Sequence, residues 1–428
     1  MISKFRSFNL LFVNVFVCFF LISSNNLDET ERNTIGYISV DIGDFDRAES
    51  VVSVSLNGVT YDHDSVLTLY ELQDNKRVFT DVQFTINQDN RYMHWILSGQ
   101  SQKGDKRKYE LVRDELRPNV SNSAVLITDQ NIGHEFIING KKVLRYNSET
   151  VYPPEGVDTT LKRSGFIHPL YAPNQAILTR TPDSTADHLH HYGIWNAWKK
   201  TRFRGEEIDF FAPQFEQGTV RHANIVSVTE GPVFSSLSAF LEHVAWQDTE
   251  QEAIAIREKR DIKVFNNSEN HFLIDISFQY NPPEPFFIEE YRYAGFSFRA
   301  TDYWTKDNTR IFTSEGLDRD QADGERSKWC VVTGETPEGV VSIIFMGDPL
   351  NYNHPEPMRV WPSNANRGTG NVFINYSPTR NTDWLLTPGN SYRLKYRLLI
   401  KDGIIGREEA ENAWLEFSDP PSVTWSKK

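Results

Sequence analysis

Along most of this chain, apolar and polar residues alternate one by one, as they do in β-strands that bury a single face. The clearest examples are residues 271–280 and 391–401. In the first stretch the alternate residues are all apolar, namely Phe272, Ile274, Ile276, Phe278 and Tyr280. Asn57-Gly58 and Asn139-Gly140 supply turn residues between such stretches and predict hairpins. The pattern therefore predicts an all-β protein.

Two further features divide the chain. Residues 113–123 are polar and separate a shorter strand-rich segment from a longer one, which predicts an N-terminal β-sandwich over residues 30–115 as an accessory domain. The second segment, residues 124–428, is too long for a simple sandwich and predicts a large β-structure of two sheets. Only residues 406–417 have a helical pattern, with Glu408 and Glu409 in the first turn. We expect a short C-terminal helix there.

The N-terminus predicts export. Lys4 and Arg6 precede an apolar run and then small polar residues, so residues 1–24 are interpreted as a signal peptide and the protein as periplasmic or secreted. No later stretch has about 18 consecutive apolar residues, so no transmembrane span is expected once the signal is removed. Cys330 is then the sole cysteine, which leaves no internal disulfide.

The charge limits the partners. The chain has a net charge of −13, and removal of Lys4 and Arg6 with the signal leaves −15. This balance disfavours nucleic acid and anionic membranes as partners. Aromatic residues make up 13% of the chain, with ten tryptophans, and exposed aromatic rings suit the apolar faces of sugars.

The most informative motif is DHLHHYGIWNAW, residues 187–198, where three of the eleven histidines occur within four positions. We expect it at the junction of a loop and a strand. On a strand, His188 and His190 would share a face and His191 would point to the other. As a metal site, His188 and His190 would supply two imidazoles, with a third ligand from Glu242, His243 or His354. As a metal-free pocket, a histidine would act as general acid or base beside a carboxylate and a tryptophan.

Other segments offer partners for this cluster. Glu242 lies beside His243 in an apolar stretch, where one of the two would be buried at a cost. Arg292 and Arg299, in YRYAGFSFRA, are candidates to bind the carboxylate of an acidic sugar, or else cover apolar surface with their stems. A Pro-rich loop contains His354, Arg359 and Trp361. Glu315, Asp318 and Asp348 are further candidate carboxylates. Each could instead lie in a solvent-exposed loop without a role in the site.

Five segments together resemble a known family. GFIHPLYAPNQAILTR, DHLHHYGIWNAW, YRYAGFSFRA, VVSIIFMGDPLNYNHPEP and LTPGNSYRLKYRLLIKDG are similar to patterns of the bacterial PmoA-like family, over about residues 130–405. The methane oxygenase label of that family requires a polytopic membrane protein, which this chain is not expected to be. The resemblance implies a large β-sandwich of the galactose-mutarotase type, with sugars bound on the concave sheet. Its motif positions are His168, His188, His190, His191, Arg299 and His354, whereas Tyr192 and Asn196 depart from it.

These observations favour an exported carbohydrate-active enzyme, a glycosidase or polysaccharide lyase with histidine and carboxylate acid–base catalysis on an oligosaccharide or polysaccharide. The predicted catalytic residues are His188, His190, His191 and Glu242. The predicted substrate-binding residues are His168, Tyr192, Trp195, Trp198, Arg299, His354 and Trp361. No cofactor is required by this hypothesis, although a divalent metal at His188 and His190 stays open. The alternatives are a glycan-binding protein without catalysis, in which tryptophans stack on sugars, and a metal-dependent oxygenase or hydrolase.

Overall fold

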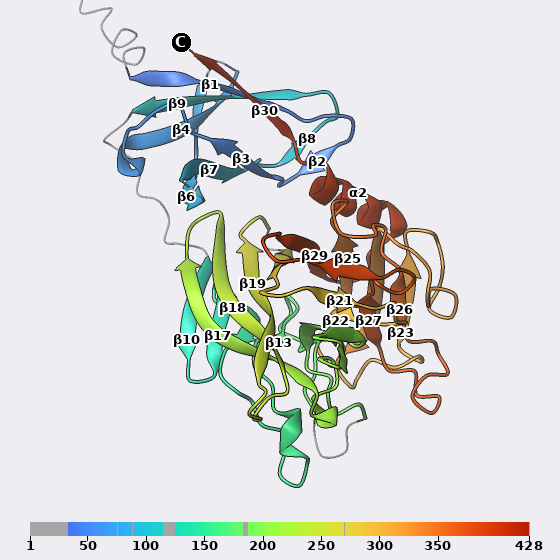
Figure 1. The fold of residues 1–428 in the computed structure, drawn as a ribbon. Coiled ribbons are helices and arrows are strands. Elements are labelled where there is room, and N and C mark those ends of the chain that lie inside the picture. The colour runs from blue at the N-terminus through green and yellow to red at the C-terminus, as the bar shows by residue number, and fades with distance from the viewer. Residues whose placement is uncertain are drawn as a thin grey trace, which may run out of the picture.

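A computed structural model describes residues 33–427, except residues 75, 88, 114–124, 183–186 and 269. The predicted signal peptide and most of the predicted boundary at residues 113–123 lie outside the described residues. The prediction of an all-β fold with one C-terminal helix is confirmed (Figure 1). Within the described residues, no helix has the length and apolar character needed to cross a membrane.

The N-terminal segment folds as a small β-sandwich. One sheet has the order β30-β1-β9-β4-β5 and a second the order β3-β7-β6, with a short β2-β8 pair beside them. Val52 and Val54 are buried in β3, as their alternation predicts, and pack with Trp95 and other core residues. The elements are β1 (Thr34–Asp41), β2 (Arg47–Ala48), β3 (Val51–Ser55), η1 (Asp64–Val66), β4 (Leu67–Gln73), β5 (Lys76–Thr80), β6 (Gln83–Asn87), β7 (Asn90–Ile96), β8 (Gln100–Ser101), β9 (Lys106–Arg113) and β30 (Ser422–Lys427).

The longer segment contains two eight-stranded antiparallel sheets around one large core. Their orders are β10-β11-β12-β13-β14-β22-β27-β26 and β17-β18-β19-β20-β29-β25-β24-β23, and a small sheet has the order β16-β15-β21-β28. The first eight-stranded sheet includes β10 (Val125–Gln130), β11 (Gly133–Ile138), β12 (Lys141–Asn147), β13 (Phe166–Leu170), β14 (Ile194–Ala197), β22 (Gly295–Arg299), β26 (Met358–Val360) and β27 (Phe373–Tyr376).

The second eight-stranded sheet holds the longest strands. They are β17 (Gly218–Thr229), β18 (Phe234–Ala245), β19 (Ala253–Phe265), β20 (His271–Asn281), β23 (Thr309–Thr313), β24 (Trp329–Thr336), β25 (Gly339–Gly347) and β29 (Tyr392–Asp402). The small sheet comprises β15 (Thr201–Phe203), β16 (Glu206–Ile208), β21 (Phe286–Ile288) and β28 (Trp384–Leu386), and the one-turn helices are η2 (Thr159–Leu161) and η3 (Pro213–Phe215).

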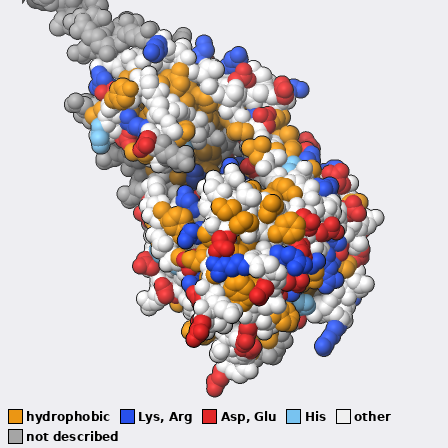
Figure 2. Space-filling view, in the orientation of Figure 1, with side chains coloured by type: hydrophobic (Ala, Val, Ile, Leu, Met, Phe, Trp, Pro, Cys, Tyr) orange, Lys and Arg blue, Asp and Glu red, His pale blue; other side chains and the backbone are white. Residues whose placement is uncertain are grey.

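Alternation decides which face of these strands is buried. The apolar face of β20, from Phe272 to Tyr280, is at most 2% exposed, and that of β29 from Leu394 to Ile400 is fully buried. Both faces contribute to the core between the two large sheets. On the visible surface of the molecule, acidic and basic side chains lie close to one another (Figure 2).

The last helix and strand of the chain connect the longer segment to the N-terminal sandwich. The predicted helix is α2 (Arg407–Ser418), with Glu408 and Glu409 in its first turn. Glu416 of this helix accepts a hydrogen bond from Arg47 Nη1 of β2 at 3.2 Å. The last strand, β30, pairs with β1, so the final residues complete the N-terminal sheet although the second domain was predicted to extend to residue 428.

A second contact joins the two parts at β6. Gln83 Oε1 of β6 accepts hydrogen bonds from the Val233 and Phe234 backbone N–H groups.

Candidate functional site

The histidine segment forms a tight turn between β13 and β14. His188 has a φ of +48° and Gly193 a φ of +51°, both in the left-handed region. A Cβ atom at Gly193 would lie 2.1 Å from the carbonyl oxygen of Ile167, so only glycine fits. The expected junction of loop and strand is therefore present. The expectation from strand alternation is wrong, however, because the three histidines precede β14 and all line one pocket.

This histidine pocket has a volume of about 330 Å³ at one end of the first large sheet. The sheet order β14-β22-β27-β26 places the segments around these strands next to one another. Aromatic rings form most of the walls, and the rim is basic. The lining residues are His188, His190, His191, Lys199, Phe211, Ala212, Gln214, Phe215, Tyr291, Arg292, Tyr293, Arg359, Trp361 and Phe373. Within the part of the chain described, no Asp or Glu side chain lines it.

Asp187 orients His188. The Asp187 Oδ2 atom is 2.9 Å from His188 Nδ1, and its Oδ1 atom accepts hydrogen bonds from Arg299 at 2.7 Å and from Arg180. Partial burial acts to raise the pKa of Asp187, but the His188 hydrogen bond and the charges of Arg299 and Arg180 hold that pKa well below its usual value. The carboxylate is therefore ionised and can only accept, so His188 Nδ1 carries the proton.

His188 is the accessible histidine of the three. Its side chain is 41% exposed, and among the described residues no hydrogen bond involves its Nε2 atom. The ring lies 4.7 Å from the Trp361 ring and 5.1 Å from that of His191, between centroids. An imidazole with a protonated Nδ1 fixed by a carboxylate and a free Nε2 is the usual arrangement of a general base.

His190 and His191 are neutral by burial. Burial lowers the pKa of His190 to about 3 and that of His191 well below its usual value, with neighbouring cations adding to both shifts. The His191 ring stacks on Phe373 at 4.7 Å and lies 5.0 Å from Trp195. Its Nδ1 atom is buried without a hydrogen-bond partner among the described residues. These two rings therefore form the floor of the pocket and offer neutral nitrogen atoms to a ligand.

Arg299 is a fully buried cation behind Trp361. Its guanidinium carbon is 4.5 Å from the Trp361 ring centroid, and burial lowers its pKa to about 10, so it stays charged at neutral pH. Its one ionic partner in the described chain is Asp187, and its Nε and Nη1 atoms lack hydrogen-bond partners. Arg299 therefore supports Asp187 and Trp361 from below, and does not itself line the pocket.

The rim adds one accessible cation and a pair of tyrosines. Arg292 is exposed, lies 5.5 Å from the Tyr293 ring centroid, and has no ion pair among the described residues. Arg359 instead pairs with Asp323, and Lys199 with Asp209. Tyr291 and Tyr293 pack edge to face at 5.0 Å, and burial raises the pKa of Tyr293 above its usual value. Tyr293 thus keeps its proton at neutral pH.

The structure separates five of the predicted site residues from this pocket. Glu242 pairs with Arg221 at 3.0 Å on the outer face of β18, because alternation turns His243 inward to Glu258 instead. Trp198 is fully buried against Tyr280 and Trp384. The remaining three are His168, bonded to Thr179 Oγ1, Tyr192, bonded to the Leu161 carbonyl oxygen, and His354, near Trp414 of α2.

Trp195 lies beneath the pocket but does not line it. It is only 2% exposed and packs beneath His191, Phe211 and Phe373, so it supports the floor without reaching a ligand. Of the tryptophans expected to stack on sugars, Trp361 alone lines the pocket.

Sequence reasoning missed several residues of the site. Asp187 begins the histidine motif, and a carboxylate next to a histidine is a signal that could have been used. Tyr293 lies within YRYAGFSFRA, where only Arg292 and Arg299 were predicted as candidates. Phe211 and Phe373 come from segments without any distinguishing pattern, and only the fold brings them to His191.

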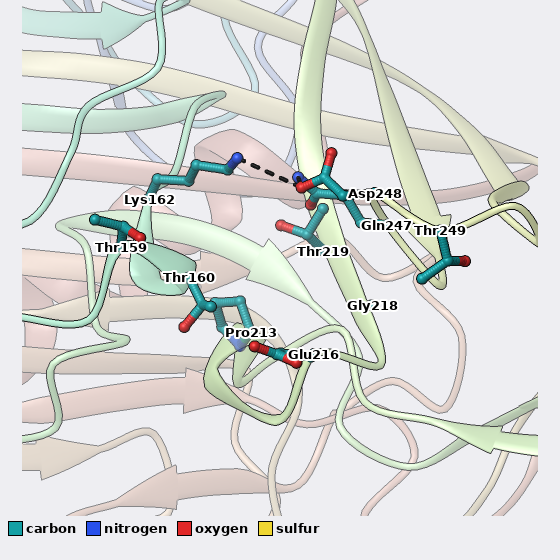
Figure 3. Close-up of a pocket in the computed structure, with 10 residues that line it drawn as sticks. All are labelled: Thr159, Thr160, Lys162, Pro213, Glu216, Gly218, Thr219, Gln247, Asp248 and Thr249. Atoms are coloured by element: carbon teal, nitrogen blue, oxygen red, sulfur yellow. Dashed lines mark hydrogen bonds and ion pairs between the residues drawn. The ribbon is translucent and has the colours of Figure 1, made fainter.

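A second pocket of about 340 Å³ lies on the other side of η3 (Figure 3). Pro213 and Glu216 line it, whereas Gln214 and Phe215 between them line the histidine pocket. Four threonines also line it, and Lys162 Nζ is 3.6 Å from Asp248 Oδ2. None of its lining residues is a histidine.

The described residues contain no group of three or more His, Cys, Asp and Glu side chains arranged to hold a metal ion. The part of the chain that the structure describes therefore shows no third ligand beside His188 and His190, the pair left open as a divalent metal site.

A comparison with family models gives one match, the family of unknown function DUF6807, over residues 134–415. The chain belongs to this family. Its match begins in β11 and ends in α2, and so includes the whole histidine pocket. The resemblance to PmoA-like proteins stays a prediction. None of the curated proteins matches the chain.

Several solved structures are similar to parts of the fold. A galactose mutarotase related enzyme from Lactobacillus acidophilus has 9% identity and a TM-score of 0.29, covering 65% of this chain and 100% of its own. A GalM/aldose epimerase homologue from C. elegans has 10% identity and a TM-score of 0.29, covering 66% and 100%. The heparan sulfate lyase HepC from Pedobacter heparinus has 7% identity and a TM-score of 0.26, covering 69% and 38%.

Proposed function

We propose that this protein is an acid–base enzyme that removes a proton from an acidic saccharide, with His188 as the base. The observation that carries the proposal is the accessible His188 ring, fixed by an ionised Asp187 in an aromatic pocket with a basic rim. Acting on the carbon next to a sugar carboxylate, this arrangement suits β-elimination, the reaction of a polysaccharide lyase.

Arg292 is the proposed carboxylate ligand. It is exposed at the pocket and has no ion pair among the described residues, unlike Arg359 and Lys199. A guanidinium binds a carboxylate through two parallel hydrogen bonds. By stabilising the negative charge that develops on the carboxylate when the neighbouring carbon loses its proton, Arg292 would lower the barrier to that step.

In the proposed reaction, His188 Nε2 takes the proton from the carbon next to the carboxylate. The electron pair of that bond forms a carbon–carbon double bond, and the glycosidic bond on the adjacent carbon breaks. The leaving oxygen takes a proton from Tyr293, whose hydroxyl stays protonated in its half-buried place. Trp361 would pack against the apolar face of the sugar ring.

The pocket supports elimination better than glycoside hydrolysis. Hydrolysis by the usual mechanism needs two carboxyl groups on either side of the glycosidic bond. Within the described residues the lining contains neither Asp nor Glu, and Glu242, the carboxylate predicted from sequence, is bonded to Arg221 elsewhere. Asp187, the carboxylate next to His188, is already bonded to His188, Arg299 and Arg180.

The test uses a panel of uronate-containing oligosaccharides and the ultraviolet absorbance of the unsaturated product. His188→Gln should lower turnover by about 100-fold or more, because a positioned base contributes about 10²–10⁴. The matched control is His63→Gln, which changes an exposed histidine of the N-terminal sandwich and should leave turnover unchanged. Equal turnover by the wild-type protein and His188→Gln would contradict the proposal.

A glycan-binding protein without catalysis is the second candidate, because most of the pocket wall is aromatic. Tight binding of uronate oligosaccharides with no unsaturated product and no other cleavage would favour it. In either case we propose that the protein acts outside the cytoplasm, as the signal-like residues 1–24 predict. Secretion of a fusion of these residues to a reporter enzyme would test that location.

A further inference from the structure

A further recess lies between the two parts of the molecule. It has a volume of about 670 Å³, within the range of ligand-binding clefts. One wall is the outer face of the second large sheet, and the other comes from β3, β6 and β7 of the N-terminal sandwich, which Figure 1 shows next to β17 and β18. We call it the interdomain cleft.

The sheet wall of this cleft is an ordered polar surface. The strand register places Thr229, Ser236, Lys263 and Asp275 in one row across four strands, and Ser227, Ser238, Asp261, Ser277 and Lys395 in the next. A third row contains Lys259, Gln279 and Arg393. Neighbouring strands are about 4.8 Å apart, so hydroxyl, amide and charged groups form a regular grid. Such a grid matches a ligand rich in hydroxyl groups.

The cleft contains more positive charge than its carboxylates neutralise. Its lining includes Lys259, Lys263, Arg393 and Lys395, against only Asp261 and Asp275. Asp261 is bonded to Lys259 at 3.2 Å, and Asp275 to Lys395 at 3.1 Å and to Arg397. Among the described residues, Lys263 and Arg393 have no ion pair. This excess is unusual in a chain with a net charge of −13.

Lys263 is the more informative of these two cations. Its ammonium group lies 4.0 Å from the Phe234 ring centroid and has neither a hydrogen bond nor an ion pair in the described chain. Burial lowers its pKa, which indicates that its charge is held at a cost. An anionic group bound in the cleft would remove that cost.

The N-terminal sandwich completes the cleft with aromatic and hydroxyl groups. His94 packs edge to face on Phe234 at 5.2 Å and stacks with Tyr92 at 6.3 Å. Its two nitrogen atoms are bonded to Ser53 and Thr85 at 2.7 Å each, so these side chains are held in fixed positions. The cleft thus combines a cationic sheet surface with an aromatic wall.

We propose that the interdomain cleft is a second binding site, for an acidic saccharide chain that carries carboxylate or sulfate groups. Lys263 and Arg393 bind the anionic groups, and the serine and glutamine side chains of the sheet bind sugar hydroxyls. The site is separate from the histidine pocket and does not depend on the chemistry proposed at His188.

Calorimetric titration of the full chain tests this site. An Arg292→Ala background weakens the histidine pocket, and the probes are oligogalacturonate, a chondroitin sulfate oligosaccharide and a neutral malto-oligosaccharide. The background protein should bind one or both charged probes but not the neutral one. Lys263→Met and Arg393→Met should each weaken that binding about tenfold or more, as expected for loss of a charged hydrogen bond. Lys108→Met, at an exposed lysine of β9, is the matched control and should change nothing.

The proposal is overturned if neither charged probe binds to the background protein, or if binding survives both substitutions. Arg393 is exposed, so its variant reports on the site even if Lys263→Met fails to fold. No binding of either charged probe to the Arg292→Ala protein, with intact turnover by the wild-type protein, would refute this site alone. Cleft binding without any His188-dependent turnover would refute only the proposed enzyme.

Discussion

Asp187 is the residue whose removal should affect both the stability and the chemistry of the histidine pocket. In Asp187→Asn the side chain keeps its shape and loses its charge. It then no longer neutralises Arg299, whose side chain is fully buried, and it no longer requires the proton to be on His188 Nδ1. We therefore expect a loss of folding free energy together with a loss of turnover.

The magnitude follows from the burial of the two partners. Removing one member of a buried ion pair costs about 3–5 kcal/mol, because the other charge is left without a partner. Asp187 is itself 22% exposed, and asparagine can still accept a neutral hydrogen bond worth about 1 kcal/mol. We thus expect Asp187→Asn to lower the free energy of unfolding by about 3 kcal/mol. Turnover should fall by about 100-fold, because His188 loses its orientation.

The matched control is Asp302→Asn. Asp302 also pairs with Arg180, at 2.7 Å, but its side chain is 54% exposed. Exposed pairs contribute about 0.2–1 kcal/mol, so this variant should lose under about 1 kcal/mol and keep full turnover. Urea unfolding followed by tryptophan fluorescence measures both variants. Equal small losses in the two variants would refute the account of the buried network.

The pH dependence gives a further check on the same variant. The folded-state pKa of Asp187 lies below its usual value of 3.8, so its contribution is fully present above about pH 4. That contribution is lost as the pH falls through the folded-state pKa. The stability difference between wild type and Asp187→Asn should therefore be constant at neutral pH and shrink in acid. A difference that grows in acid would contradict the assignment.

Three further variants test other parts of the account. Gly193→Ala should lower the free energy of unfolding, measured in urea, by more than about 3 kcal/mol, because its Cβ would meet the Ile167 carbonyl oxygen. Gly205→Ala, at a φ of +85° with open space around it, should lower it by about 1 kcal/mol. Similar losses in the two variants would argue against the tight turn. Burial raises the pKa of Glu356 to about 8, so the free energy of unfolding of the wild-type protein should fall between about pH 4.5 and pH 8. Glu356→Gln should abolish that fall, and the same pH dependence in both proteins would contradict this prediction. Trp361→Ala should weaken saccharide binding about tenfold or more in calorimetry, whereas Tyr61→Ala, at a residue 96% exposed in the N-terminal sandwich, should leave it unchanged. Equal affinities of the wild-type protein and Trp361→Ala would exclude Trp361 from the site.

The strands were the part of the fold that the sequence predicted best. In β20 and β29 the core-facing residues, from Phe272 to Tyr280 and from Leu394 to Ile400, recur at every second position, and this period does not depend on which strands pair with them. The return of β30 to β1 was not predictable, because pairing between the two ends of the chain depends on the arrangement of every element between them.

The lining of the histidine pocket was predicted in part. The histidines are local in sequence, and their rings do meet Trp361 in one pocket. Their directions were not predictable, because His188 and Gly193 adopt left-handed backbone angles that interrupt the alternation. Glu242 was chosen for its neighbour His243, yet alternation turned Glu242 outward and His243 toward Glu258. Which carboxylate reaches a histidine depends on strand register, which one sequence does not specify.

The most direct test of the central proposal follows the proton itself. An oligouronate deuterated at the carbon next to each carboxylate is incubated with the wild-type protein, and label loss is compared with product formation by mass spectrometry. The account predicts that one deuterium is released to solvent for each unsaturated product formed, and that His188→Gln releases almost none. Cleavage with the label retained, or equal release by His188→Gln, would contradict proton abstraction by His188.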